Sequence, residues 1–185
     1  MAPIWNLTRR TLAMAIAVAG LMVLLSANIA APASDPWLIK RFEDLSHNGN
    51  SSCSSKFTDS IATMPAISRI KGSCCSPMDL KRYSEQTEGL TKYRDIAMIP
   101  QDPYEIPVAT AQQATVYYDM QLTVGEQKVY DYAMTNSNEK GPCCCQCWRW
   151  KMYGGLAKYL IHEHDFTGKQ IVDVWNLSDG CGGGM

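Results

Sequence analysis

Residues 141–150, GPCCCQCWRW, place four cysteines within five positions, with two tryptophans close behind them. Three kinds of site use several sulfurs at close range: a metal site, a thiol–disulfide redox site, or a set of structural disulfides. Gly141 and Pro142 interrupt the helical pattern before the cysteines, and a second helical pattern begins at Trp148. The stretch therefore predicts a cysteine-rich turn between two helices.

The helices on either side of this turn have their own signals. Thr123 and Glu126 have the spacing of a capping box, so we expect a helix from there to about residue 136. Residues 148–164 space their apolar side chains along one helix face, although Gly154-Gly155 weakens the pattern. Before the first helix, residues 116–124 alternate apolar and polar side chains, which favours a strand and leaves a helix start as the alternative.

A third helix is expected near the C-terminus. Thr167 and Gln170 form a second capping box, and Phe166 and Ile171 have the spacing of a hydrophobic staple. The pattern ends near Gly180. Residues 114–185 are therefore expected to form a small, mainly α, cysteine-motif domain.

The part of the chain before this domain gives weaker signals. Residues 34–113 are polar, contain three prolines within 100–107, and predict a loop-rich region with one short helix near residues 76–95. Residues 1–33 have the layout of a signal peptide. The arginine pair Arg9-Arg10 precedes an apolar run, which makes a twin-arginine type possible, and small residues follow. We expect a periplasmic or extracellular protein, in contact with a membrane only if this leader is retained.

The composition excludes some classes of function. The formal net charge is -1, which argues against nucleic acid as a partner. The chain holds no phosphate-binding glycine loop and neither the H-E-x-x-H nor the G-x-S-x-G pattern. We therefore expect a binding protein rather than an enzyme, with redox chemistry as the catalytic alternative.

The cysteines of the turn have a spacing that suits a metal ion. Cys143, Cys145 and Cys147 occupy alternate positions, so in an extended segment their side chains point the same way. Three thiolates suit Cu(I), while Zn(II) needs a fourth ligand, for which Cys181 is a candidate. The helix N-terminus that follows, with Arg149 close by, favours the thiolate form. The predicted cofactor is Cu(I) or Zn(II).

Two other roles for the cysteines stay open. Cys144 and Cys147 have the C-x-x-C spacing of a redox pair, a feature faintly similar to the cysteine-motif helix hairpin of cytochrome c maturation proteins. Cys53 with Cys74 or Cys75 is a candidate structural disulfide, because disulfides persist outside the cytosol. Eight cysteines in total permit complete pairing.

The run Pro142-Cys143-Cys144-Cys145-Gln146-Cys147 resembles the P-C-Y-C-G-C signature of the PCYCGC-motif proteins, small exported or lipid-anchored bacterial proteins. The resemblance covers about residues 126–182, with Trp175 and Cys181 matching a later segment of the family. Cys144 and Gln146 depart from the signature, and no lipid-attachment cysteine follows the leader. The resemblance implies an exported cysteine-rich protein with a metal-related role.

These features predict an exported protein that binds a soft metal ion for metal handling or for delivery to a periplasmic metalloenzyme. The first alternative is a thiol–disulfide redox protein acting on a redox partner. The second is a structural accessory subunit stapled by disulfides.

Overall fold

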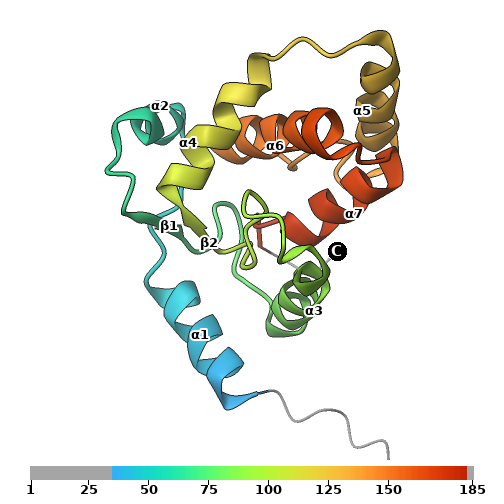
Figure 1. Cartoon of the computed structure of the whole chain (residues 1–185). Coiled ribbons are helices and arrows are strands. Elements are labelled where there is room, and N and C mark those ends of the chain that lie inside the picture. The colour runs from blue at the N-terminus through green and yellow to red at the C-terminus, as the bar shows by residue number, and fades with distance from the viewer. Residues whose placement is uncertain (1–34, 183–185) are drawn as a thin grey trace, which may run out of the picture. The chain divides into compact units, whose positions relative to one another are not determined.

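The computed structural model describes residues 35–182, and the signal peptide expected over residues 1–33 lies outside them. The fold is mainly α, as the sequence predicts (Figure 1). None of the helices in the described part is both long and apolar enough to cross a membrane. The α-helices are α1 Pro36–His47, α2 Ser55–Ser60, α3 Leu80–Leu90, α4 Val108–Val116, α5 Val124–Asn136, α6 Trp148–His164 and α7 Gly168–Ser178.

Both predicted capping boxes are formed. In α5 the Thr123 hydroxyl accepts from the Glu126 N–H, and the Glu126 carboxylate accepts from the Thr123 N–H at 2.7 Å. Thr167 and Gln170 make the same reciprocal pair at the start of α7. Each box satisfies backbone donors that the first helical turn leaves free, so both helices begin where the sequence places them.

Helix α6 forms the centre of the core. Its buried face includes Trp148, Leu156 and Leu160, and α4 crosses it (Figure 1). Gly155 makes this crossing possible, because a Cβ there would lie 2.0 Å from the Ala114 carbonyl oxygen. The glycine that weakens the helical pattern in the sequence is therefore required by the packing of the two helices.

The strand expected over residues 116–124 is not formed. Val116 ends α4, a 3-10 turn follows at Tyr117–Asp119, and the chain then reaches the cap of α5. Tyr117 packs against Tyr159 with ring centroids 5.0 Å apart, while the Tyr118 hydroxyl accepts from the Trp150 indole. Successive side chains thus both contact α6, so the alternating pattern does not correspond to two opposite faces.

The N-terminal half contains more helix than the sequence predicts. Helix α3 matches the expected short helix, but α1 was not predicted. The Asp35 carboxylate caps α1 by accepting from the Trp37 N–H at 2.9 Å, and Pro36 occupies the first turn, where its missing N–H costs nothing. The predicted boundary between residues 113 and 114 falls inside α4, and the described residues 35–182 belong to one compact unit.

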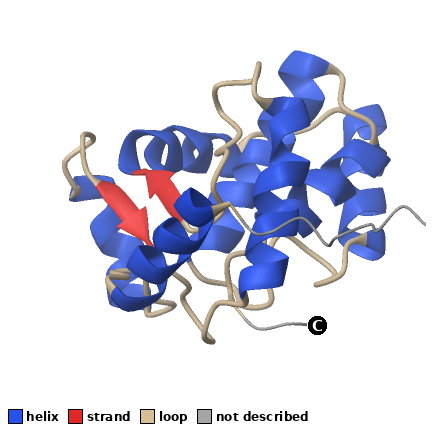
Figure 2. Ribbon diagram, turned by 90° about the horizontal axis from the view of Figure 1, so that it is seen from below, coloured by secondary structure: helices blue, strands red, loops and turns tan. Residues whose placement is uncertain are grey.

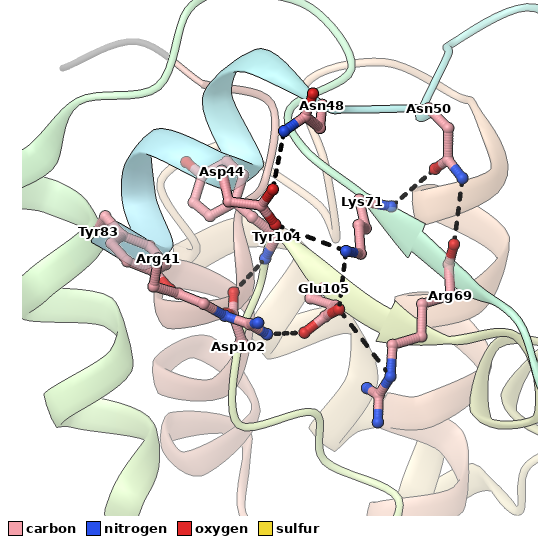
Figure 3. Close-up of polar contacts among 10 residues, drawn as sticks. All are labelled: Arg41, Asp44, Asn48, Asn50, Arg69, Lys71, Tyr83, Asp102, Tyr104 and Glu105. Atoms are coloured by element: carbon pink, nitrogen blue, oxygen red, sulfur yellow. Dashed lines mark hydrogen bonds and ion pairs between the residues drawn. The ribbon is translucent and has the colours of Figure 1, made fainter. Parts of the chain in front are cut away.

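Two short antiparallel strands, β1 Arg69–Lys71 and β2 Glu105–Pro107, are the only strands in residues 35–182 (Figure 2). The Glu105 carboxylate, 9% exposed, forms ion pairs with Arg41 of α1 and with Arg69 and Lys71 of β1 (Figure 3). The Asn50 amide bonds the Arg69 carbonyl and the Lys71 N–H (Figure 3). This network fixes both ends of β1, and the loop that follows it contains Cys74 and Cys75.

Candidate metal centre

All eight cysteines converge on one region that is built from four segments. Cys53 lies in the loop between α1 and α2, and Cys74 and Cys75 lie in the loop after β1. The turn before α6 supplies four more, and Cys181 comes from the segment after α7. Short sulfur–sulfur distances in the cluster include Cys53–Cys75 3.1 Å, Cys53–Cys145 3.3 Å, Cys74–Cys75 3.7 Å, Cys74–Cys181 3.9 Å, Cys75–Cys145 3.7 Å, Cys143–Cys181 2.9 Å and Cys144–Cys181 3.0 Å.

The C-terminal segment is held against the loop after β1 by backbone contacts. The Cys181 carbonyl accepts from the N–H groups of Cys75 and Ser76, the latter at 2.8 Å. A Cβ at Gly182, where φ is +80°, would lie 2.0 Å from the Ser76 carbonyl oxygen. This glycine therefore permits an approach that no other residue allows, and the approach brings Cys181 to the cluster.

A second set of contacts fixes Asp179 just ahead of Cys181. Arg82 forms an ion pair with the Asp179 carboxylate at 2.9 Å, and the Gln86 amide donates to the Asp179 carbonyl at 2.6 Å. The Asp179 carboxylate also accepts from the Cys181 N–H at 3.1 Å. Helix α3 thus positions the last cysteine of the chain.

None of the eight cysteines forms a disulfide. A disulfide bond is about 2.05 Å long, whereas the sulfurs of Cys143 and Cys181, for example, are 2.9 Å apart. The predicted bridge from Cys53 to Cys74 or Cys75 is therefore not formed in the structure, although these sulfurs lie close together. The sequence treated them as separate from the turn, whereas the structure places them in the same cluster.

The predicted ligands divide within this cluster. Cys145 and Cys147 lie with Cys53 in one group of mutually close sulfurs, and Cys145 also lies with Cys181 in another. Cys143 belongs to none of these groups, although its sulfur lies 2.9 Å from that of Cys181 and its thiol hydrogen-bonds Cys147. Cys144, proposed for a redox pair with Cys147, also makes its short contact with Cys181.

The cluster extends from the core to the surface. Cys143, Cys147 and Cys181 are buried, Cys53, Cys74 and Cys145 are half-buried, and Cys75 and Cys144 are exposed. The buried sulfurs belong to the same core as Trp148 and Met152. One edge of the cluster is therefore open to solvent, while the opposite edge is closed by α6.

The start of α6 stabilises negative charge on sulfur. Cys147 is the N-cap residue of α6, and its pKa is lowered by hydrogen bonds from the thiols of Cys143 and Cys74. The backbone N–H of Arg149 contributes to the same shift. On the exposed side the pKa of Cys75 is also lowered, because hydrogen bonds from Cys53 and other thiols outweigh the effect of its burial. Two thiols of the cluster thus favour the thiolate, the form that binds metal, whereas burial and contacts with neighbouring thiols raise the pKa of Cys53, Cys74, Cys143, Cys145 and Cys181.

Arg149 carries a buried positive charge beside these sulfurs. Its side chain is 1% exposed, and its guanidinium donates to the carbonyls of Pro103 and Gly72 at 2.8 and 3.2 Å. No carboxylate in the described part of the chain forms an ion pair with it. Burial alone would lower the pKa of Arg149. Electrostatic interactions with Tyr153 and with the nearby thiols outweigh this effect, and the net result is a raised pKa. The acidic groups in this balance are Tyr153, Cys74, Cys143 and Cys181.

The sequence located the turn and Arg149 but not the full cluster. The adjacent pair Cys74 and Cys75 hinted at a shared site. Neighbouring cysteines form a disulfide with each other only with distortion, and they cannot both form a disulfide with the same third cysteine. Comparison of the chain with protein-family models, with curated proteins and with solved structures found no match.

Proposed function

We propose that the protein binds a soft metal ion, Cu(I) or Zn(II), through its cysteine cluster. The observation that carries this proposal is the convergence of eight unbridged cysteine sulfurs on one region. Thiolates select soft ions such as Cu(I) and Zn(II), and groups of three or four sulfurs lie within 4.8 Å of one another.

Arg149 supports the metal-binding role over a set of structural disulfides. A buried cation is costly unless a negative charge lies nearby. This guanidinium has no carboxylate partner among the described residues, so the cysteine sulfurs beside it are the candidates for that negative charge. Disulfide sulfurs are neutral and would leave the charge uncompensated. Metal-bound thiolates carry the negative charge that the site requires.

The exposed edge of the cluster supports a role in metal handling or delivery. Cys75 and Cys144 are exposed, so an incoming ligand can reach an ion at this edge and exchange for a cysteine. The leader-like pattern of residues 1–33 supports a site of action in the periplasm or outside the cell, with an exported metalloenzyme as the proposed recipient.

Metal uptake by the full chain, purified without oxygen under reducing conditions, tests the proposal. We expect bound copper or zinc after gel filtration, and its loss in the triple variant Cys143→Ser, Cys145→Ser, Cys147→Ser. The matched control removes three sulfurs outside the cluster, Met64→Leu, Met120→Leu and Met134→Leu, and should keep the metal. Equal metal content in the two triple variants would overturn the proposal.

One observation favours a second candidate, thiol–disulfide exchange. Cys75 is exposed, and its sulfur lies 3.1 Å from that of Cys53. The Cys75 thiolate would attack a partner disulfide and release one partner thiolate. Cys53 would then displace the other, leaving a Cys53–Cys75 disulfide and a reduced partner. A Cys53→Ala variant should then accumulate a mixed disulfide at Cys75, which a metal-binding protein without exchange activity does not form.

A further inference from the structure

We infer that the cluster holds three metal ions in one ring bridged by cysteine thiolates, an inference that depends on the proposed metal-binding function. The ligand groups are three in number, and in each group every sulfur lies within 4.8 Å of the others. The groups are Cys75, Cys144, Cys145 and Cys181; Cys53, Cys145 and Cys147; and Cys53, Cys74 and Cys75.

Each pair of groups shares one cysteine. Cys145 belongs to the first and second groups, Cys53 to the second and third, and Cys75 to the first and third. A thiolate sulfur has enough lone pairs to bind two cations at once. If each group holds an ion, the shared cysteines must be bridging ligands, and the three ions are joined in a closed ring.

The three shared sulfurs also form a triangle. Their separations are 3.1 Å for Cys53–Cys75, 3.3 Å for Cys53–Cys145 and 3.7 Å for Cys75–Cys145. They come from the loop between α1 and α2, the loop after β1 and the turn before α6. Each edge of the triangle therefore corresponds to one ion, bound by the two sulfurs of that edge and completed by cysteines further out.

The outer cysteines match this arrangement. Cys147 completes the group at the Cys53–Cys145 edge, and Cys74 completes the group at the Cys53–Cys75 edge. Cys144 and Cys181 complete the remaining group, at the Cys75–Cys145 edge. Every edge thus has at least one terminal cysteine of its own. The Cys75–Cys145 group offers the four sulfurs of a closed Zn(II) site, and the two groups of three sulfurs leave their fourth position to water.

The balance of charge favours Zn(II) in this ring. Seven cysteines supply the three groups, and Arg149 is the buried cation beside them. If all seven are thiolates, three divalent ions and one guanidinium neutralise them completely. Three Cu(I) ions would leave three negative charges, and a single Zn(II) would leave four, in a partly buried site where uncompensated charge is costly.

The number of ions and their connection can be measured on the reduced full chain loaded with Zn(II) or with 113Cd(II), a spectroscopic substitute. Native mass spectrometry should show three Zn(II) per chain. The 113Cd NMR spectrum should show three resonances, each split by coupling to the other two through shared sulfurs. One ion per chain, or uncoupled resonances, would overturn the ring while leaving metal binding intact. No bound ion would overturn the proposed function itself.

Two neighbouring substitutions provide the matched comparison. Cys144→Ser removes a terminal ligand from a group that keeps three sulfurs, so it should retain three coupled ions. Cys145→Ser removes a bridge and leaves one group with only Cys53 and Cys147, so at least one ion and its couplings should be lost. Equal losses in the two variants, both folded by circular dichroism, would contradict the assignment of Cys145 as a bridge.

Discussion

At the scale of single residues, Arg149 links the core to the cysteine cluster. Its guanidinium has two carbonyl partners and neighbouring thiols but no carboxylate partner among the described residues. This arrangement is costly when the sulfurs are neutral and favourable when they are anionic. The residue thus makes the stability of the core depend on the charge of the cluster.

Replacing Arg149 should weaken metal binding. Loss of one partner of a buried charge pair costs about 3–5 kcal/mol, so Arg149→Met is expected to lower the metal affinity by a factor of about 100 or more. Competition with a chromophoric chelator measures the affinity. The control is Lys158→Met, because Lys158 lies on the same helix and also donates to two carbonyls, those of Tyr118 and Met120. Similar affinities for the two variants would contradict the role of Arg149.

The pair of Glu126 and His162 predicts a pH dependence away from the cluster. Hydrogen bonds from Thr123 and His162 lower the pKa of Glu126 to about 2, and the hydrogen bond to Glu126 raises the pKa of His162 above its usual 6.5. The contribution of the histidine to stability is present below pH 6.5 and is lost as pH rises through its folded pKa. The contribution of the carboxylate is present above pH 4.5 and is lost as pH falls towards 2.

An NMR titration of His162 tests this pair. The midpoint should lie above 6.5 in the wild type and should fall towards that value in Glu126→Gln, which keeps a residue that suits the capping box. Glu163→Gln is the control, because that carboxylate acts on His162 only through charge and contributes least to the shift. If both variants move the midpoint equally, the 2.7 Å hydrogen bond between His162 and Glu126 is not the main cause of the raised pKa of His162.

At the scale of secondary-structure elements, the crossing of α4 and α6 positions the turn that carries four of the cysteines. Gly155→Ala would place a methyl group 2.0 Å from the Ala114 carbonyl oxygen, and backbone atoms must shift to relieve it. We expect a loss of about 1–3 kcal/mol or more in the free energy of unfolding. Gly125→Ala in α5 is the control, because nothing lies within 4 Å of its Cβ, and it should gain up to about 1 kcal/mol. Urea unfolding measures both, and equal stabilities would contradict the close approach.

Local signals predicted several elements but not the site. The capping boxes at Thr123 and Thr167 predicted the starts of α5 and α7, because the bonds involved span only three residues. The alternation in residues 116–124 predicted a strand that has no partner to pair with. Likewise, Cys53 meets Cys145 only because the folded chain brings the loop between α1 and α2 to the turn before α6. That contact joins residues 92 positions apart and leaves no local pattern.

At the scale of the whole molecule, the cluster joins four segments that the chain separates widely. The loop between α1 and α2, the loop after β1, the turn before α6 and the C-terminal segment all supply sulfurs. An ion bound among them connects the strand pair, the central helix and the end of the chain. Metal binding and folding are therefore expected to be coupled.

Removal of the metal should lower the stability of the whole unit. A ligand at about a thousand times its Kd contributes about 4 kcal/mol, which in a protein of this size corresponds to a decrease in Tm on the order of 10 °C. Thermal unfolding of the reduced protein with and without a chelator measures the difference. Cys145→Ser should show a smaller difference in Tm than the wild type. If the chelator leaves the Tm of both proteins unchanged, the coupling of metal binding to folding is contradicted.

The most direct test of metal binding by reduced cysteines is one pair of intact masses, native and denatured, from protein purified without oxygen. We predict that the native mass includes bound zinc or copper and that the denatured, alkylated chain carries a label on each of its eight cysteines. A native mass without metal, together with a denatured chain that lacks eight protons and takes up no label, would show four disulfides in place of a metal site and would contradict the account.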